Sequence, residues 1–389
     1  MNFKYYIPTK ILFGCGQLAN LHKEKLPGTR ALIVTTGGRS VVDNGYLART
    51  EEELKAAGCT FVLFNKITAN PDRSEVMDGA ALAKAENCDF IVGLGGGSPI
   101  DAAKAIAVMA TNPGDYWDYM VRGTGGGRPV SVTPLPVVAI TTTAGTGTEA
   151  DPWTVISNAA TGEKFGFGID GTFPVLAVVD PELMLTVPRD YTVFQGFDAL
   201  FHSLEGYLAN IATPISDIFA LKAVSLIAEN LPAAVFDGGD IAARENMALA
   251  NTLSGMVEST SGCISEHALE HILSGVYKNL PHGAGLIMLS VAYFSKIAEK
   301  HTSDDRLVEL AKALGNKNAK TPEDFIAALQ KLQQACGSDK LKMSDYGIEK
   351  ERLREFAAAA KTQNALSFRL DPCDLSIADC AEIYERSYR

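Results

Sequence analysis

Apolar positions in the first half of the chain form short continuous runs separated by stretches with helical spacing. The runs are rich in Val, Ile and Leu and lie at residues 31–36, 60–65, 90–95, 136–141 and 176–180. Continuous runs of this length and composition are typical of strands buried on both faces. Helices are expected between them at 50–58, 73–86 and 99–111. This alternating order predicts an α/β unit with a doubly wound, mostly parallel sheet.

The hydrophobic pattern changes after residue 188. Strand-like runs stop there, and segments rich in Ala, Leu and Glu with helical spacing continue to Tyr388. A chain of 389 residues that is 47% hydrophobic can form two cores, because one core rarely grows beyond about 250–300 residues. We therefore predict an α/β domain at 1–188 and an all-helical domain at 189–389.

Charge and composition exclude several classes of protein. The formal net charge is −11, so a polyanion such as nucleic acid would be repelled on average. The longest apolar stretch, at 283–294, is shorter than the roughly 20 residues that span a bilayer. The first seven residues lack the features of a signal peptide, and seven scattered cysteines without a CxxC pair fit reduced thiols. We expect a cytoplasmic protein with neither a nucleic-acid nor a membrane partner.

A glycine-rich motif, GLGGGSPIDAAK at residues 93–104, lies where a buried run ends and a helix is expected to begin. Glycines let backbone N–H groups approach an anion, and a helix N-terminus adds favourable partial positive charge. The motif therefore predicts a pyrophosphate site. A well-built helix start is the alternative, since Ser98 suits an N-cap, Pro99 the first helical position and Asp101 the first turn.

A second motif, TTTAGTGTE at residues 141–149, directly follows another buried run. Hydroxyl groups and glycines at the end of a strand can hold ribose and phosphate, although an ordinary polar turn has the same composition. The carboxyl ends of parallel strands share one edge of a sheet. The two motifs together therefore favour a ligand crevice more strongly than either does alone.

The helical half contains a cluster of potential metal ligands. Asp198 and His202 are four residues apart and share one face of a helix, although such a pair is also common in solvent. His267, His271 and His282 follow, so four of the six histidines in the chain lie in these two segments. One carboxylate and three imidazoles suit Fe(II) or Zn with an open position for a substrate oxygen, which leaves one histidine over.

Cys263 precedes His267 by four residues. It is a possible ligand or nucleophile, but burial as a small apolar side chain is the more common role of such a residue. We do not include it in the predicted site.

Together these motifs resemble the iron-containing, group III alcohol dehydrogenases. The resemblance runs nearly end to end and also includes residues 3–16, Asn70-Pro71, 179–181 and 196–198. It implies a metal-dependent NAD(P)H alcohol dehydrogenase or aldehyde reductase, with the fold of that family and of dehydroquinate synthase. The reaction is reversible hydride transfer between the nicotinamide and a small primary or secondary alcohol. The resemblance also implies a homodimer or a higher homo-oligomer.

The resemblance assigns roles to individual positions. It implies a metal site, for Fe(II) or alternatively Zn, made of Asp198, His202, His267 and His282. His271 then lines the active site without binding metal, and we predict that it relays a proton to solvent. The implied cofactor positions are Asn70, Gly96, Gly97, Ser98, Thr142, Thr143, Thr146 and Lys164, of which Lys164 could otherwise be a solvated lysine in a turn.

Two departures from the family pattern concern the helical half. Fifteen residues separate His267 from His282, where many members have fourteen, and we place the extra residue at 277–280. The stretch 286–290 ends in Ser where many members have Pro, which affects the outline of the substrate pocket.

The choice of nucleotide depends on the end of the first apolar run. No acidic residue follows it that would bind a ribose 2′-hydroxyl and reject a 2′-phosphate. Gly37, Gly38 and Ser40 match the Gly-Gly-X-Ser of NADP-using members, and Arg39 could pair with a phosphate or point to solvent. We favour NADP over NAD.

Three alternatives stay open at this point: a dehydroquinate synthase-like cyclase, a glycerol dehydrogenase-like polyol enzyme, and a non-catalytic NAD(P)H or metal sensor. The helical half has no cluster of Lys, Arg and His for a phosphorylated substrate beside the predicted ligands, which counts against the cyclase.

Overall fold

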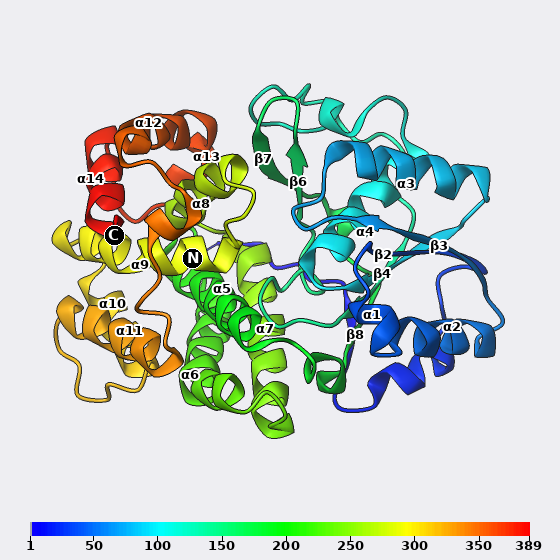
Figure 1. Ribbon diagram of the computed structural model, residues 1–389, viewed down its shortest axis with the longest axis horizontal. Helices are drawn as coiled ribbons and strands as arrows, with labels where there is room; N and C mark the ends of the chain where they lie inside the picture. Colours follow the sequence, from blue (N-terminus) through cyan, green and yellow to red (C-terminus); the bar gives the residue numbers. More distant parts are fainter. Residues whose placement is uncertain (1) are drawn as a thin grey trace. The chain divides into compact units, whose positions relative to one another are not determined.

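A computed structural model describes residues 2–389, and the chain in it divides into two units (Figure 1). A six-stranded parallel sheet lies at the centre of the first unit. This unit comprises residues 6–186. Its strands are β1 (Lys10–Phe13), β2 (Arg30–Thr36), β3 (Thr60–Ile67), β4 (Phe90–Gly95), β5 (Val137–Thr141) and β8 (Leu176–Val179). They are ordered β1-β8-β5-β4-β2-β3 and pair in parallel throughout. The predicted doubly wound parallel sheet is confirmed.

Helices cover both faces of this sheet, which explains the continuous apolar runs. The helices of the unit are α1 (Ser40–Asp43), α2 (Tyr46–Ala56), α3 (Arg73–Ala85) and α4 (Gly97–Thr111). Successive residues of a strand point to opposite faces. In β2, Leu32 and Val34 therefore join a core with α3 and α4, while Ala31 and Ile33 join a core with α1 and α2.

Two further strands form a separate antiparallel hairpin, β6 (Thr154–Asn158) and β7 (Glu163–Phe167). The apolar pattern does not predict this hairpin, because polar side chains such as Glu163 and Lys164 interrupt it. Both of these side chains are nevertheless buried.

The second unit comprises residues 187–389 together with residues 2–5, and its regular elements are helical, as predicted. The α-helices are α5 (Arg189–Leu208), α6 (Pro214–Phe236), α7 (Ile241–Ser261), α8 (Ser265–Val276), α9 (His282–Glu299), α10 (Asp304–Ala313), α11 (Pro322–Cys336), α12 (Leu353–Gln363), α13 (Ala365–Phe368) and α14 (Ile377–Ser387). Helix α9 packs against α5, α8, α11 and α14. It therefore runs through the core of this unit.

Helix α6 is the most apolar long helix of the described residues. By length and composition alone it could cross a membrane, with 44% of its most apolar window buried inside the fold. This finding does not overturn the expectation about 283–294, because Asp217, Lys222 and Glu229 interrupt α6 and no uninterrupted apolar run within it is as long. Helix α6 packs along α5 and α7. Core helices of soluble proteins pass the same test, so the result is weak support for a membrane role.

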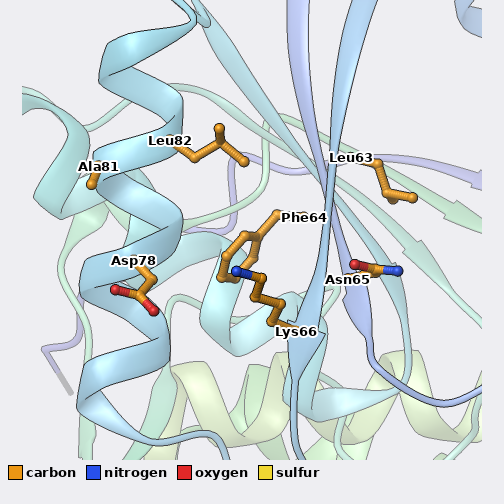
Figure 2. Close-up of a pocket in the computed structure, with 7 residues that line it drawn as sticks. All are labelled: Leu63, Phe64, Asn65, Lys66, Asp78, Ala81 and Leu82. Atoms are coloured by element: carbon orange, nitrogen blue, oxygen red, sulfur yellow. The ribbon is translucent and has the colours of Figure 1, made fainter.

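A hollow of about 310 Å³ lies between β3 and α3 (Figure 2). It is lined by Leu63, Phe64, Asn65, Lys66, Asp78, Ala81 and Leu82. None of the residues predicted to bind cofactor or metal lines this hollow, so it is not the candidate active site.

Candidate metal centre and cofactor loops

Helix α5 carries the first two predicted ligands. Asp198 and His202 are one helical turn apart, and the Asp198 Oδ1 atom lies 3.7 Å from the His202 Nε2 atom. Both residues are only 5% exposed. The i, i+4 spacing therefore places a carboxylate and an imidazole on the buried face of α5, and not on a solvated surface.

Helices α8 and α9 bring the other two imidazoles to the same carboxylate. The Nε2 atom of His267 lies 3.6 Å from Asp198 Oδ1, and that of His282 lies 3.5 Å from it. His282 is the first residue of α9, and residues 277–281 connect it to the end of α8. This connection accommodates the fifteen-residue spacing, and all four predicted ligands converge.

The geometry of these four residues fits a divalent metal ion. Ligand atoms bound tetrahedrally at about 2.1 Å from an ion lie about 3.4 Å from one another, and each of the three Nε2 atoms lies at a similar distance, 3.5–3.7 Å, from Asp198 Oδ1. Asp198 Oδ1 and His267 Nε2 are buried, and neither has a hydrogen-bond partner. Leaving such atoms unsatisfied is costly. A cation at this point would satisfy them.

Two carboxylates behind the ring of ligands orient the imidazoles. Glu205 on α5 bonds His267 Nδ1, and Glu270 on α8 bonds His282 Nδ1. In metal sites such an outer carboxylate fixes the imidazole tautomer so that Nε2 faces the ion. Our sequence analysis missed both glutamates. Glu205 carried a usable signal, since it follows His202 by three residues on the same helix.

Electrostatics favour the charged form of Asp198. Burial raises its pKa, but the three neighbouring histidines more than offset burial and lower the pKa to about 2. Burial likewise lowers the pKa of His267, whereas Cys263 and Glu205 raise it well above the usual range. Asp198 is therefore an anion at neutral pH, and His267 would have to release its proton when a metal ion binds.

The N-terminus of α8 is held by a buried aspartate. The Ser265 backbone N–H donates to Asp371 Oδ1 over 2.9 Å. Burial raises the pKa of Asp371 to about 7, partly offset by its bonds to Ser265. Asp371 therefore fixes the start of the helix that carries His267.

A close backbone approach positions the start of α9. A Cβ atom on Gly283 would lie 2.1 Å from the backbone oxygen of Phe194 on α5. Only glycine allows α9 to begin this close to α5. The residue next to His282 thus explains how the first turn of α9 reaches Asp198.

Three more polar side chains surround the centre. His271 lies with its ring centroid 5.2 Å from that of His282. Glu258 on α7 has its Oε2 atom 3.7 Å from His202 Nε2. Cys263 follows α7, and burial, together with the charge of Glu258, raises the pKa of its thiol well above the usual range. Sequence spacing alone did not point to Glu258.

The predicted cofactor residues gather at the carboxyl edge of the sheet in the α/β unit. Gly37, Gly38 and Ser40 follow β2, and Asn70 follows β3. The glycine-rich loop follows β4, and the threonine-rich loop follows β5. These four strands are neighbours in the order β5-β4-β2-β3. The chain reverses its direction across the sheet between β2 and β4, and such a switch point is where ligands of open α/β sheets bind.

The glycine-rich loop ends in a helix whose N-terminus has no side-chain cap. Gly96 occupies the N-cap position of α4, and Gly97 begins the helix. The alternative that Ser98 acts as the N-cap is therefore wrong, because the helix starts two residues earlier than that alternative requires. Uncapped N–H groups at a helix start form an anion site.

The glycine-rich and threonine-rich loops pack directly on each other. A Cβ atom on Gly96 would lie 2.9 Å from the Thr143 side chain, and one on Gly97 would lie 2.6 Å from Thr146. The Thr142 N–H also donates to the backbone oxygen of Gly95 over 2.9 Å. The run of glycines thus permits the contact that brings the predicted phosphate-binding residues together.

A buried lysine ties these loops to the rest of the unit. Lys104 on α4 is fully buried, and its ammonium group donates to the Thr148 hydroxyl, the Asp151 carboxylate and backbone oxygens of Asp151 and Trp153. Asp101 accepts from Thr148 and from the Val155 N–H. Asp101 is therefore not simply a first-turn acid, since it fixes the threonine-rich loop to α4.

Three predicted cofactor residues need individual comment. Lys164 lies on β7 and is only 6% exposed, so it is not a solvated lysine in a turn. Asn70 has a φ of 56°, the left-handed conformation that Asn tolerates better than most residues. The Arg39 guanidinium is exposed and pairs with Asp43 at 3.0 Å, on the first turn of α1.

Two family profiles match the two units. The profile described as "Iron-containing alcohol dehydrogenase" matches residues 8–181, and that described as "Fe-containing alcohol dehydrogenase family, C-terminal" matches residues 192–388.

Full-length relatives and solved structures agree with these profiles. The chain is 33% identical to a 1,3-propanediol dehydrogenase of Klebsiella pneumoniae over 376 residues, 94% of each chain. It is 36% identical to an NAD-dependent methanol dehydrogenase of Bacillus methanolicus over 86% of this chain and 87% of that one. The archaeal Red Sea brine pool alcohol dehydrogenase ADH/D1 superposes with a TM-score of 0.94 at 33% identity, covering 100% of this chain and 99% of that one.

The fold, the converging ligand set and these similarities define one class. The chain belongs to the iron-containing alcohol dehydrogenase family. It is an alcohol dehydrogenase, an oxidoreductase that acts on CH–OH groups, and this assignment excludes a cyclase or a non-catalytic sensor.

Proposed function

We propose that Asp198, His202, His267 and His282 bind one divalent metal ion, Fe(II) by the family resemblance with Zn as the alternative. The supporting observation is the position of three imidazole Nε2 atoms within 3.5–3.7 Å of one carboxylate oxygen. The donor set of one oxygen and three nitrogens suits either metal. Glu205 and Glu270 hold the two imidazoles of α8 and α9 in the orientation that an ion requires.

We propose that the loops at the carboxyl edge of the sheet bind a nicotinamide dinucleotide. The uncapped start of α4 would receive the pyrophosphate, because its N–H groups and helix dipole favour an anion. The hydroxyls of Thr142, Thr143 and Thr146 would hold phosphate and ribose oxygens. Asn70 and Lys164 complete the proposed site.

The reaction that fits these residues is reversible hydride transfer between the nicotinamide and a small primary or secondary alcohol. The metal would supply Lewis acidity, which stabilises the negative charge that develops on the substrate oxygen. Three of the four proposed ligands, Asp198, His202 and His267, are only 5% exposed. A 1,3-propanediol dehydrogenase and an NAD-dependent methanol dehydrogenase are among the relatives, in keeping with a short alcohol.

We propose that the site accepts a 2′-phosphate and favours NADP modestly over NAD. The supporting features are the absence of an acid directly after β2 and the proximity of Arg39 to Gly37 and Gly38. The ion pair of Arg39 with Asp43 is exposed. Such pairs contribute about 0–1 kcal/mol, so the guanidinium can exchange Asp43 for a phosphate. Arg39→Ala should lower kcat/KM for NADPH by about 10-fold and leave that for NADH nearly unchanged.

We propose that His271 moves the hydroxyl proton toward solvent. Its ring is partly exposed and lies next to His282, and an imidazole titrates near neutral pH. His271→Ala should reduce turnover far more than metal content and should alter the pH dependence of kcat. Full activity with an unchanged pH profile would rule out this role.

A homodimeric or higher oligomeric state and a cytoplasmic location stay predictions from the sequence and the family resemblance.

Nicotinamide absorbance tests the proposed function directly. The protein is treated with a chelator, divided, and reloaded with Fe(II), Zn(II) or buffer, and each sample receives a panel of short aldehydes with NADH and with NADPH in parallel. We expect oxidation of the nucleotide in proportion to aldehyde only in the reloaded samples. Equal rates in chelated and reloaded samples would contradict the metal-dependent reaction.

A further inference from the structure

A glutamate of α7 lies beside the proposed metal centre, in addition to the four proposed ligands. The Glu258 Oε2 atom is 3.7 Å from the His202 Nε2 atom, which is also the distance between that nitrogen and Asp198 Oδ1. An ion bound to His202 Nε2 would lie about 2.1 Å from it, so the Glu258 oxygen would be no more than about 6 Å from the ion. A second carboxylate therefore borders the place where a substrate alcohol would react.

The position of Glu258 on its helix is unfavourable for an acid. Helix α7 ends at Ser261, so Glu258 lies in its last turn. The partial negative charge at the C-terminus of a helix disfavours an acidic side chain there. The Glu258 side chain is also only 17% exposed, which removes much of the water that would solvate its charge. A cationic group bound beside Glu258 would offset both costs.

Glu258 is more accessible than the proposed ligands nearest to it. The side chains of Asp198 and His202 are 6% and 7% exposed, against 17% for Glu258. A small molecule that enters the centre from solvent can therefore contact the Glu258 carboxylate more easily than these two ligands.

We propose that Glu258 selects a short primary amino alcohol, with a protonated amine on the carbon next to the carbinol carbon. This inference rests on the proposed metal centre and deepens the proposed function. With its hydroxyl group at the open position of the centre, such a molecule would donate N–H hydrogen bonds of about 2.8 Å to the Glu258 carboxylate. Two carbon atoms between oxygen and nitrogen suit the separation of at most about 6 Å between ion and carboxylate.

The charges around the centre explain this preference. A divalent ion and the Asp198 carboxylate together carry a positive charge, which repels an ammonium group unless a second carboxylate is present. In the reaction the hydride passes from the carbinol carbon to the nicotinamide, the hydroxyl proton leaves to solvent, and the ammonium group is unchanged. A neutral alcohol gains nothing from Glu258, because a carboxylate opposes the negative charge that develops on the substrate oxygen.

A matched pair of alcohols tests this preference. 2-Aminoethanol and 1-propanol have the same length, and an ammonium group in the first replaces a methyl group in the second. We expect Glu258→Gln to lower the ratio of kcat/KM for 2-aminoethanol to that for 1-propanol by about 10–100-fold, because a charged hydrogen bond is lost. The assay is made at about pH 7.5, where an aliphatic primary amine is protonated. Glu258→Asp should keep part of the wild-type ratio.

Glu245→Gln is the matched control, because Glu245 is an exposed glutamate of the same helix. It should leave the ratio and the metal content at wild-type values. Metal content per folded chain should also be normal in Glu258→Gln. Loss of metal from Glu258→Gln would show that Glu258 is a ligand of the ion, and it would overturn the inference.

Equilibrium binding provides a measurement that needs no turnover. An alcohol cannot react in the presence of reduced nucleotide, so the metal-loaded protein saturated with NADH or NADPH can be titrated with each alcohol by calorimetry. The Kd for 2-aminoethanol should rise by about 10–100-fold in Glu258→Gln, and the Kd for 1-propanol should not rise. Equal changes in Kd for the two alcohols would overturn the inference.

The outcomes separate this inference from the proposed function. Oxidation of 1-propanol by the wild type, with the same ratio of kcat/KM values in the wild type and Glu258→Gln, would overturn the role of Glu258 and leave the proposed function in place. Failure of the metal-loaded wild type to oxidise either alcohol or any other short alcohol would overturn the proposed function, and the role of Glu258 with it.

Discussion

The two units of this chain bury charge in opposite ways. In the α/β unit, the ammonium group of Lys104 is fully buried and donates to four oxygens. In the helical unit, Asp198 Oδ1 and His267 Nε2 are buried and accept or donate no hydrogen bond. A fully paired charge stabilises a scaffold, whereas converging unpaired donors mark a site for a ligand. The comparison supports a structural role for Lys104 and the ligand role that we propose for Asp198 and His267.

The largest expected effect comes from removing the anion of the metal centre. Asp198→Asn should reduce alcohol oxidation by at least about 1000-fold, because the charge that attracts the cation is lost. Far-ultraviolet circular dichroism should stay unchanged, since the helix needs no charge at this position. Steady-state assays across metal concentrations check this prediction. Activity restored by excess metal would show that the carboxylate affects affinity only.

Removing the paired charge of Lys104 should lower the stability of the protein and leave metal binding unchanged. Lys104→Met leaves Asp151 and Asp101 buried without their cation, which should lower the free energy of unfolding by about 3–5 kcal/mol. Denaturant unfolding gives this value. Metal content per folded chain should not change, because Lys104 lies in the α/β unit.

Lys84→Met is the control for that substitution, because Lys84 is an exposed lysine of α3. Its stability should match that of the wild type. A comparable loss in both variants would mean that the Lys104 network is not the cause.

Asp371 provides a pH-dependent test within the helical unit. Its folded pKa of about 7 lies above the ordinary value of 3.8, so the native state binds this proton more tightly than the unfolded state. Its contribution to stability is therefore present below about pH 4 and is lost as the pH rises to 7, with a total of a few kcal/mol.

Asp371→Asn should remove this slope, because the amide oxygen still accepts from the Ser265 N–H and carries no charge. Unfolding free energies at pH 4, 6 and 8 give the difference between the two proteins. The variant should gain stability relative to the wild type as the pH rises. A difference that is independent of pH would refute the raised pKa.

The smallest effect concerns the carboxylates behind the ligands. Glu205→Gln should weaken metal binding by about 10–100-fold, because the amide orients His267 without strengthening it as a donor. Calorimetric titration of the metal-free protein measures this change. Glu266→Gln is the matched control, because Glu266 is a buried glutamate of α8 whose pKa is raised well above its usual value by burial and by the nearby Glu205. An equal loss of metal affinity in Glu205→Gln and Glu266→Gln would contradict a specific role for Glu205.

Much of the architecture could be predicted from the hydrophobic pattern. Continuous apolar runs indicated the buried parallel strands, because each strand of this sheet is covered on both faces. The hairpin of β6 and β7 escaped prediction, because its buried Glu163 and Lys164 are stabilised by tertiary contacts that no local pattern records. Strand β1 escaped because it lies at the edge of the sheet and begins with an exposed lysine, so it lacks the continuous buried run of the other strands.

The sequence predicted the proposed metal ligands but not the residues that surround them. Helical spacing joined Asp198 to His202, and the family resemblance added His267 and His282, which the structure brings to the same carboxylate. Glu205 and Glu270 were not predicted, because an outer carboxylate can come from any element that packs behind the ligand. Cys263 was set aside as a core residue, and only the three-dimensional arrangement places its sulfur near two ligands.

Metal stoichiometry is the most direct test of the central claim. The wild type and His282→Ala are loaded with Fe(II) or Zn(II), freed of unbound metal, and analysed by plasma mass spectrometry alongside circular dichroism. We predict one divalent ion per wild-type chain and almost none per folded chain of the variant. Equal metal in both proteins, or none in the wild type, would contradict the proposed metal centre.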